Sequence, residues 1–317
     1  MRRLSVLMIT LAMVWSACES PQRGHPLSPK VVDTIEMLPT DASVMGYLDA
    51  HALRTSEFGS FLYKENLNAI KELEPYRVMQ QLLGWDPFEQ IDDLYWTLNP
   101  ETDPEQGFFL LAKGDFDMET LFSSLKINSP DIKLMREERD GHLFYEIKVQ
   151  GFQIMVVDKE MMVIGQESDV ISWEQAYLGA RQPPSEGPLK SRIAVLNRLQ
   201  VKSGLWLWLD PTAIELDVSS DVVENVVLGA EFVDRLRMHS KISCKDNEAA
   251  ETISEALKGM MATLKLSATD DRQIIDLIND IETRVNENEI DLNTELTVKE
   301  FQTVMQHRGI EIGKALD

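Results

Sequence analysis

Short runs of alternating hydrophobic and polar residues fill the middle of the first half of the chain. Four such runs follow one another with links of only a few residues: 132–138, 142–149, 152–157 and 161–165. Links this short join neighbouring antiparallel strands, and Asp140-Gly141 is a strong signal for a two-residue hairpin turn. The pattern therefore predicts an antiparallel meander over residues 132–166.

The rest of the first half alternates between strand and helix patterns. Strands are predicted over residues 44–49, 93–98 and 107–112, and a mostly helical stretch over residues 51–83. Asp117 is placed to cap a helix that runs to about Lys126, and Ser168 to cap another that runs to Tyr177.

The second half repeats this mixture with longer helices. Residues 189–199 are predicted to be helical, 204–210 to form a strand, and 226–233 with 236–244 to form a hairpin. Hydrophobic residues at helical spacing predict amphipathic helices over 248–264 and 270–285. A strand over 290–296 follows, and Thr297 with Glu300 forms a capping box that opens the last helix.

Three pairs of segments match between the halves, in the same order. Residues 47–53 (YLDAHAL) resemble 208–214 (WLDPTAI), 119–126 (ETLFSSLK) resemble 251–258 (ETISEALK), and the strand and helix of 161–177 resemble those of 290–306. Repeated order indicates duplication of a unit. We predict an α+β fold of two related units, residues 31–180 and 189–317, each a mainly antiparallel sheet with helices on one face. The Pro-rich segment 179–188 would link them.

The N-terminus has the order of an export signal. Arg2 and Arg3 precede an apolar run from Leu4 to Trp15, which is too short to span a bilayer, and Ser16-Ala17-Cys18 follows. This resembles the lipobox of bacterial lipoproteins, although Trp15 stands where the family usually has Leu. The resemblance implies that residues 1–17 are a signal peptide and that Cys18 is lipidated. Residues 18–30 are rich in Pro and small polar residues, which predicts a flexible tether. The alternatives are ordinary secretion with a free Cys18 and an uncleaved anchor.

A second resemblance lies in the body of the chain. Leu38-Pro-Thr-Asp-Ala42 followed by Tyr47-Leu-Asp49 is similar to a turn and strand of uncharacterised bacterial envelope lipoproteins with a repeated α+β unit. The resemblance implies that fold and no assigned activity. With the lipobox it implies an exported protein, held by its lipid on the periplasmic side of a Gram-negative membrane.

The net charge limits the classes of partner that the protein could bind. The formal net charge is −22, a balance that repels nucleic acid and favours solubility and cationic partners. Two cysteines are present, so lipidation of Cys18 would leave Cys244 without an intramolecular partner. Because Cys244 ends an alternating strand pattern, a buried structural thiol is the favoured interpretation.

No pattern for phosphate loops, dinucleotide folds, zinc proteases or nucleophile elbows is present. The five histidines are scattered, which favours surface positions over a metal site, and no cofactor is predicted. The run of oxygen-bearing side chains over 286–295 favours a solvated strand over a calcium loop, because the Gly of such a loop is missing. Trp206 and Trp208 share one face of a strand that is apolar on both faces, which favours core packing over an apolar ligand groove.

The favoured function is a non-enzymatic, lipid-anchored envelope protein that binds another envelope protein or has a structural role. The first alternative is a carrier or chaperone for an apolar ligand beside Trp206 and Trp208, which a continuous cavity would support. The second is an enzyme, which a cleft with carboxylates and a histidine would support.

Overall fold

The computed structural model describes residues 24–307 except for 62–70, 72–76, 78–79, 82, 100–106, 129–133, 150–151, 180–187, 201, 203, 212–221 and 268–271. The predicted signal peptide, Cys18 and most of the predicted linker between the units lie outside the described residues. In that part of the chain, no helix is both long and apolar enough to cross a membrane.

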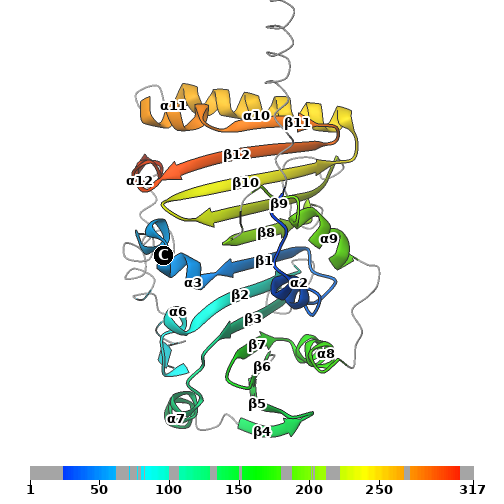
Figure 1. Ribbon diagram of the computed structural model, residues 1–317, viewed down its shortest axis with the longest axis vertical. Helices are drawn as coiled ribbons and strands as arrows, with labels where there is room; N and C mark the ends of the chain where they lie inside the picture. The colour runs from blue at the N-terminus through cyan, green and yellow to red at the C-terminus, as the bar shows by residue number, and fades with distance from the viewer. Residues whose placement is uncertain are drawn as a thin grey trace, which may run out of the picture.

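The described strands form one sheet with the order β11-β12-β10-β9-β8-β1-β2-β3-β7-β6-β5-β4, and every pairing is antiparallel (Figure 1). The strands are β1 (Val44–Asp49), β2 (Ile91–Leu98), β3 (Phe108–Gly114), β4 (Leu134–Arg139), β5 (His142–Val149), β6 (Phe152–Val157), β7 (Met161–Gly165), β8 (Leu205–Leu209), β9 (Val223–Phe232), β10 (Arg235–Cys244), β11 (Glu282–Asn286) and β12 (Glu289–Thr297).

The α+β class and the antiparallel character of the sheet are confirmed, but the two predicted units share a single sheet. Strand β1 of the first half pairs with β8 of the second, and Tyr47 lies opposite Trp206. From β1 outward the strand order is β1-β2-β3-β7-β6, and from β8 outward in the other direction it is β8-β9-β10-β12-β11. A duplicated unit would give this mirrored order.

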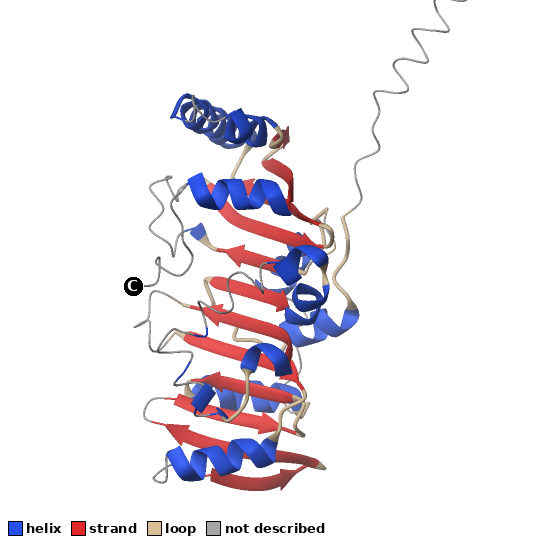
Figure 2. Ribbon diagram, turned by 90° about the vertical axis from the view of Figure 1, so that its left-hand side faces the viewer, coloured by secondary structure: helices blue, strands red, loops and turns tan. Residues whose placement is uncertain are grey.

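The helices are α2 (Pro29–Ile35), α3 (Ala50–Thr55), α6 (Pro87–Gln90), α7 (Met118–Asn128), α8 (Glu167–Tyr177), α9 (Pro188–Leu196), α10 (Asn247–Ser267), α11 (Arg272–Asn279) and α12 (Val298–His307). They lie on both faces of the sheet, as the view along its edge shows (Figure 2). The prediction of helices on one face is therefore incorrect.

Alternation along the strands explains how both faces are covered, because neighbouring side chains point to opposite sides. Leu111 and Val163 belong to the largest cluster, which α2, α8 and α9 cover. Their neighbours Ala112 and Met162 belong to a second cluster, on the opposite face, which α7 covers. Helices α10 and α12 cover that opposite face in the second half.

Local signals fix several ends of these elements. Asp140 and Gly141 have φ angles of 50° and 83°, as the hairpin turn between β4 and β5 requires. The Asp117 carboxylate accepts the Thr120 N–H at 3.0 Å and so caps α7 as predicted. Helix α8 begins two residues earlier than predicted, and its N-cap is Gln166 rather than Ser168.

The helix predicted over residues 270–285 is wrong in its second half. Helix α11 ends at Asn279, and Glu282–Asn286 forms strand β11, which pairs with β12 through a tight turn with Glu287 at φ 53°. The apolar stripe of the helix stops at Ile281, and Thr283 and Val285 then alternate with charged residues. The hairpin gives these residues ladder partners that an extended helix would not.

The predicted tether is shorter than expected. The His25 N–H donates to the Leu199 carbonyl at 2.8 Å, and the Leu27 N–H donates to Asn197 Oδ1 at 2.7 Å. Leu27 also packs against the largest core cluster. The chain is therefore in contact with the body from residue 24 onward rather than from residue 31.

Candidate functional site

One face of the second half carries charged side chains where the first half has a core. Side chains of β10 alternate between the two faces: Leu236, Met238 and Ile242 point to the face that α10 and α12 cover, and Arg237, His239 and Lys241 point to the other face. Across the ladder to β12, Arg237 lies opposite Glu295 and Lys241 opposite Asp291. The strand register therefore places bases directly against acids on this face.

Lys241 is the centre of a buried ionic cluster. Its Nζ lies 2.8 Å from Glu289 Oε2 and 2.9 Å from Asp291 Oδ1, and its side chain is 7% exposed. The Nε2 atom of the fully buried His239 lies 2.9 Å from the same Asp291 oxygen. The Gln200 N–H donates to His239 Nδ1 at 2.8 Å, so in the neutral ring Nε2 carries the hydrogen and donates to Asp291.

This cluster is satisfied within the protein. Burial raises the pKa of Asp291, but hydrogen bonds from His239 and Lys241 outweigh it and hold that pKa below its ordinary value. Glu289 also pairs with Arg198 from the segment after α9. An Asp held ionised between two donors fixes strands and loops to one another, and it is not arranged to exchange protons with a substrate.

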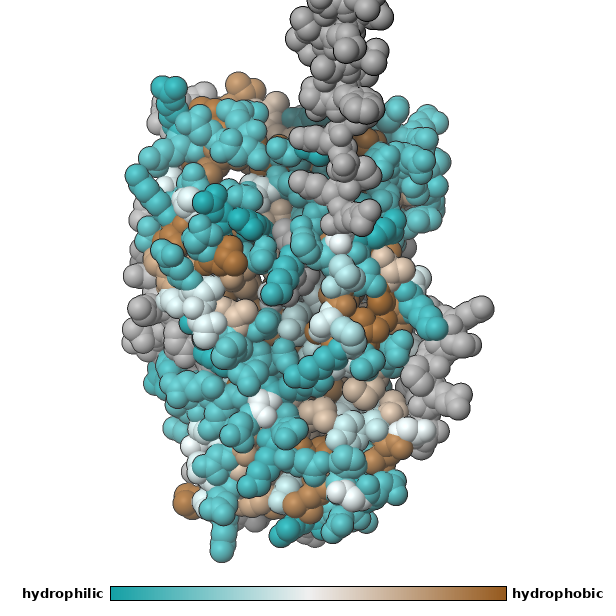
Figure 3. All heavy atoms as spheres, viewed as in Figure 1, coloured by the Kyte–Doolittle hydropathy of each residue, from teal (hydrophilic) through white to brown (hydrophobic). Residues whose placement is uncertain are grey.

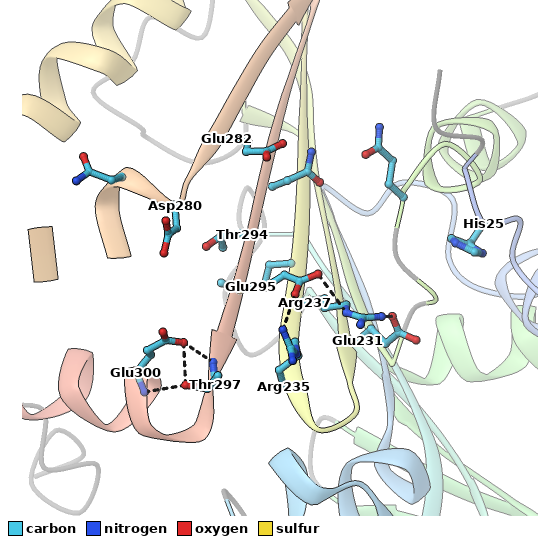
Figure 4. Close-up of a pocket in the computed structure, with 14 residues that line it drawn as sticks. His25, Glu231, Arg235, Arg237, Asp280, Glu282, Thr294, Glu295, Thr297 and Glu300 are labelled. Carbon is cyan, nitrogen blue, oxygen red and sulfur yellow. Dashed lines mark hydrogen bonds and ion pairs between the residues drawn. The ribbon is translucent and has the colours of Figure 1, made fainter. Parts of the chain in front are cut away.

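A looser set of charges forms the rim above this cluster. Arg237 Nε lies 3.2 Å from Glu295 Oε1, and Arg237 Nη1 lies 3.7 Å from Glu231 Oε2 (Figure 4). Arg235 Nη1 donates to the other Glu295 oxygen at 3.2 Å. Arg235, Arg237 and Glu295 are about half exposed, so these pairs exchange readily with water or with a ligand.

The rim borders a cleft of about 730 Å³. Strand β11 pairs with β12 only as far as Asn293, so no strand of the described residues lies beside the outer edge of residues 294–297, and the cleft reaches this edge. The surface over this part of the sheet is mostly hydrophilic and hollowed (Figure 3). The cleft is lined by His25, Gln200, Glu231, Arg235, Arg237, Met238, Asn279, Asp280, Glu282, Asn293, Thr294, Glu295, Thr297 and Glu300.

The cleft brings together carboxylates and one histidine, the combination expected of an enzyme, but they are not arranged as a catalytic pair. Figure 4 shows His25 at one end of the cleft and Asp280 and Glu300 at the other. Glu300 accepts the Thr297 N–H at 2.7 Å, and hydrogen bonds from the Thr297 backbone and side chain lower its pKa. Glu300 is thus the capping-box residue predicted from the sequence.

The predicted site residues lie elsewhere or outside the described residues. Cys18, the predicted lipidation site, lies outside the described residues. Trp206 is fully buried, with its ring centroid 5.9 Å from that of Tyr47, and Trp208 is 7% exposed beneath the Arg192 guanidinium, 4.2 Å from its ring centroid. Protein side chains therefore fill the space where the sequence allowed an apolar groove.

Cys244 is buried beneath α10, as its strand pattern predicted. Burial, and then the charges of Asp246 and Glu224, raises the pKa of its thiol. In the run of oxygen-bearing side chains over residues 286–295, which was predicted to be a solvated strand, Asp291 and Glu289 pair with Lys241. No group of three potential metal ligands forms among the described residues.

The prediction of surface histidines is wrong for His239, and the sequence reasoning missed the site that contains it. A signal was present, because residues 237–241 read Arg-x-His-x-Lys and residues 289–295 read Glu-x-Asp-x-Asn-x-Glu. Alternating bases and alternating acids are complementary once two strands pair. Two helices and a strand separate these segments in the chain, so their pairing was not evident.

Comparisons with known proteins assign this chain neither a family nor a function. No family model and no curated protein matches the chain. Among solved structures, crystal form III of TP0453 is 8% identical with a TM-score of 0.49, covering 86% of this chain and 96% of that one. Crystal form I of TP0453 is 10% identical with a TM-score of 0.44, covering 86% and 95%. Similarity at this level assigns no function.

Proposed function

We propose that this protein is a lipid-anchored component of the bacterial cell envelope that binds another envelope protein and has no catalytic activity. The observation that carries the proposal is that His25, seven residues after Cys18, lines the charged cleft. A lipid on Cys18 would therefore keep the cleft at the membrane that holds the anchor.

The chemistry of the cleft supports binding. Its rim offers Arg235, Arg237 and Glu295 at half-exposed positions beside the less exposed Glu231, and pairs at half-exposed positions cost little to exchange. Mixed charges of this kind select a partner by electrostatic complementarity. The buried cluster beneath them supplies a rigid floor, because its charges are already matched.

The carrier hypothesis has less support. An apolar ligand needs a cavity lined mainly by hydrophobic side chains. Of the residues that line the cleft, only Met238 is hydrophobic, and both tryptophans are packed in the core.

The anchor is tested by the intact mass of protein purified from its own membrane fraction, beside a Cys18→Ala variant. We expect the mass of residues 18–317 plus acyl chains, with the variant losing that addition and the membrane association. A soluble wild-type protein without acyl mass would refute the anchor.

Binding is tested by a photo-crosslinking residue in place of Glu282, which is exposed and lines the cleft. In membranes of the native cell we expect a discrete cross-linked product, lost when Arg235→Glu and Arg237→Glu are added. It should persist with Lys258→Glu on α10, the matched control. A product indifferent to both changes, or none, would argue against the cleft as a binding site.

A further inference from the structure

The segment that contains α9 is strongly basic in an otherwise acidic protein. Residues 188–202 contain Lys190, Arg192, Arg198 and Lys202 but no Asp or Glu, in a chain of net charge −22. The surface of this segment therefore differs in sign from the average surface of the molecule.

Three of these four cations face solvent. Lys190, Arg198 and Lys202 are exposed, and the positions of Lys190, Ala194 and Arg198 recur every four residues along one side of α9 and its C-terminal turn. Arg192 points inward, where its guanidinium stacks on Trp208 and its Nη1 lies 3.2 Å from Met45 Sδ. We call Lys190, Arg198 and Lys202 the basic face.

The basic face is only partly neutralised by ion pairs with described residues. Arg198 pairs with Glu289, whereas Lys190 and Lys202 form no ion pair with any described residue. Two exposed ammonium groups and one partly matched guanidinium are thus available to an anionic partner.

The N-terminal segment docks directly beside the basic face. The His25 N–H donates to the Leu199 carbonyl, and a Cβ atom on Gly24 would lie 2.5 Å from the Asn197 carbonyl oxygen. Gly24 is six residues after Cys18. A fully extended chain of that length spans at most roughly 20 Å, so a lipidated Cys18 holds this part of the protein close to the bilayer.

We propose that the basic face docks on anionic phospholipid headgroups of the leaflet that holds the Cys18 lipid, and so sets the orientation of the body on the membrane. The inference rests on the lipid anchor of the proposed function. Cations within a Debye length of about 8–10 Å feel the negative surface, and the acidic remainder of the protein is repelled from it. The cleft, which shares the docked N-terminal segment, is then held at a fixed height above the headgroups.

The test uses full-length lipidated protein in vesicles, with or without a third of anionic phosphatidylglycerol in phosphatidylcholine. Lysine acylation by a water-soluble reagent is followed by mass spectrometry. We expect acylation of Lys190 and Lys202 to slow about fivefold in the anionic vesicles, the equivalent of ~1 kcal/mol per cation. Lys258 and Lys265 on α10 should react equally in both, and 1 M salt should abolish the difference.

Variants separate charge from position. Lys190→Glu should remove most of the protection at Lys202, whereas Lys258→Glu, a charge reversal at an exposed position of α10, should leave it unchanged. Equal protection in neutral vesicles or in 1 M salt, or no protection at all, would overturn the proposal. So would protection of Lys258 and Lys265 instead, which would indicate that the exposed Met260, Leu264 and Leu266 side of α10 meets the lipid.

Failure of the anchor gives a different result from failure of the docking. A protein without acyl mass that does not float with vesicles refutes the anchor and the orientation together. A lipidated protein that floats but shows no protected basic face refutes the orientation alone.

Discussion

Replacing Lys241 by methionine should destabilise the protein more than any exposed charge change. The Lys241 side chain is 7% exposed and contacts two carboxylates, Glu289 at 2.8 Å and Asp291 at 2.9 Å, which are 17% and 13% exposed. Methionine keeps most of the volume of the side chain but removes the charge. Two largely buried carboxylates would then lose their shared cation.

The structure sets the size of this effect. Removing one partner of a buried ion pair costs about 3–5 kcal/mol, because the other charge stays buried without compensation. Asp291 keeps the hydrogen bond from His239, and Glu289 keeps its pair with Arg198, so the lower end applies. A loss of about 3 kcal/mol corresponds to a fall in melting temperature of roughly 5 °C for a domain of this size.

The assay is urea unfolding followed by tryptophan fluorescence at neutral pH. The midpoint should fall while the dependence on urea concentration stays constant. Lys258→Met is the matched control, because Lys258 is 56% exposed and pairs with Glu255 along the same helix. Its free energy of unfolding should change by less than about 0.5 kcal/mol.

A double variant tests the stated cause. If uncompensated charge is the cause, adding Asp291→Asn to Lys241→Met should restore part of the lost stability. The reasoning is refuted if Lys241→Met unfolds within about 0.5 kcal/mol of the wild type, or if the two substitutions destabilise additively.

Three further predictions concern pH, the thiol and a close contact. The pKa of Asp291 is held below its ordinary value, so its ionised form stabilises the folded protein above about pH 4, and this stability is lost as the pH falls further. In an acid titration followed by unfolding, Asp291→Asn should therefore lose less stability below about pH 4 than the wild type does. Because Cys244 is fully buried and burial raises the pKa of its thiol, Cys244 in folded Cys18→Ala protein should resist a thiol reagent at pH 8 and react only in urea; fast labelling of folded protein would contradict this. A Cβ on Gly46 would lie 2.1 Å from the Trp96 ring across the β1–β2 ladder, so Gly46→Ala should lower the unfolding free energy by about 1–3 kcal/mol in the same urea assay, and an unchanged midpoint would show that the indole moves freely.

The elements that could be predicted are those whose signals are local. The meander depends on turns such as Asp140-Gly141, and α7 and α12 depend on caps at Asp117 and Thr297; each signal lies within a few residues of the structure it determines. Residues 282–285 were wrongly predicted to be helical because a helical stripe and a hairpin overlap at Ile281. Pairing with β12 decides between them, and the segment alone does not contain that information.

The candidate site could not be predicted because it depends on two long-range pairings. One is the β10–β12 ladder, which sets Lys241 against Asp291. The other is the return of the segment after α9, which places the Gln200 N–H on His239. Trp206 and Trp208 show the same limit, because an apolar strand predicts burial but not whether a ligand or α9 provides the cover.

The mirrored strand order makes the difference between the two halves informative. In the first half, Phe109, Val163 and Met155 fill the face beneath α8. The equivalent strands of the second half, β10, β12 and β11, carry charges on that face, and α10 and α12 lie on the opposite face. An antiparallel sheet can keep a hydrophobic layer on one face and polar groups on the other, so the second half tolerates charges on this face, buried at His239 and Lys241 and half exposed at Arg235 and Arg237. That face lies next to the docked N-terminal segment, so the proposed lipid on Cys18 would hold these charged groups near the membrane, where they can meet a partner while the core stays covered.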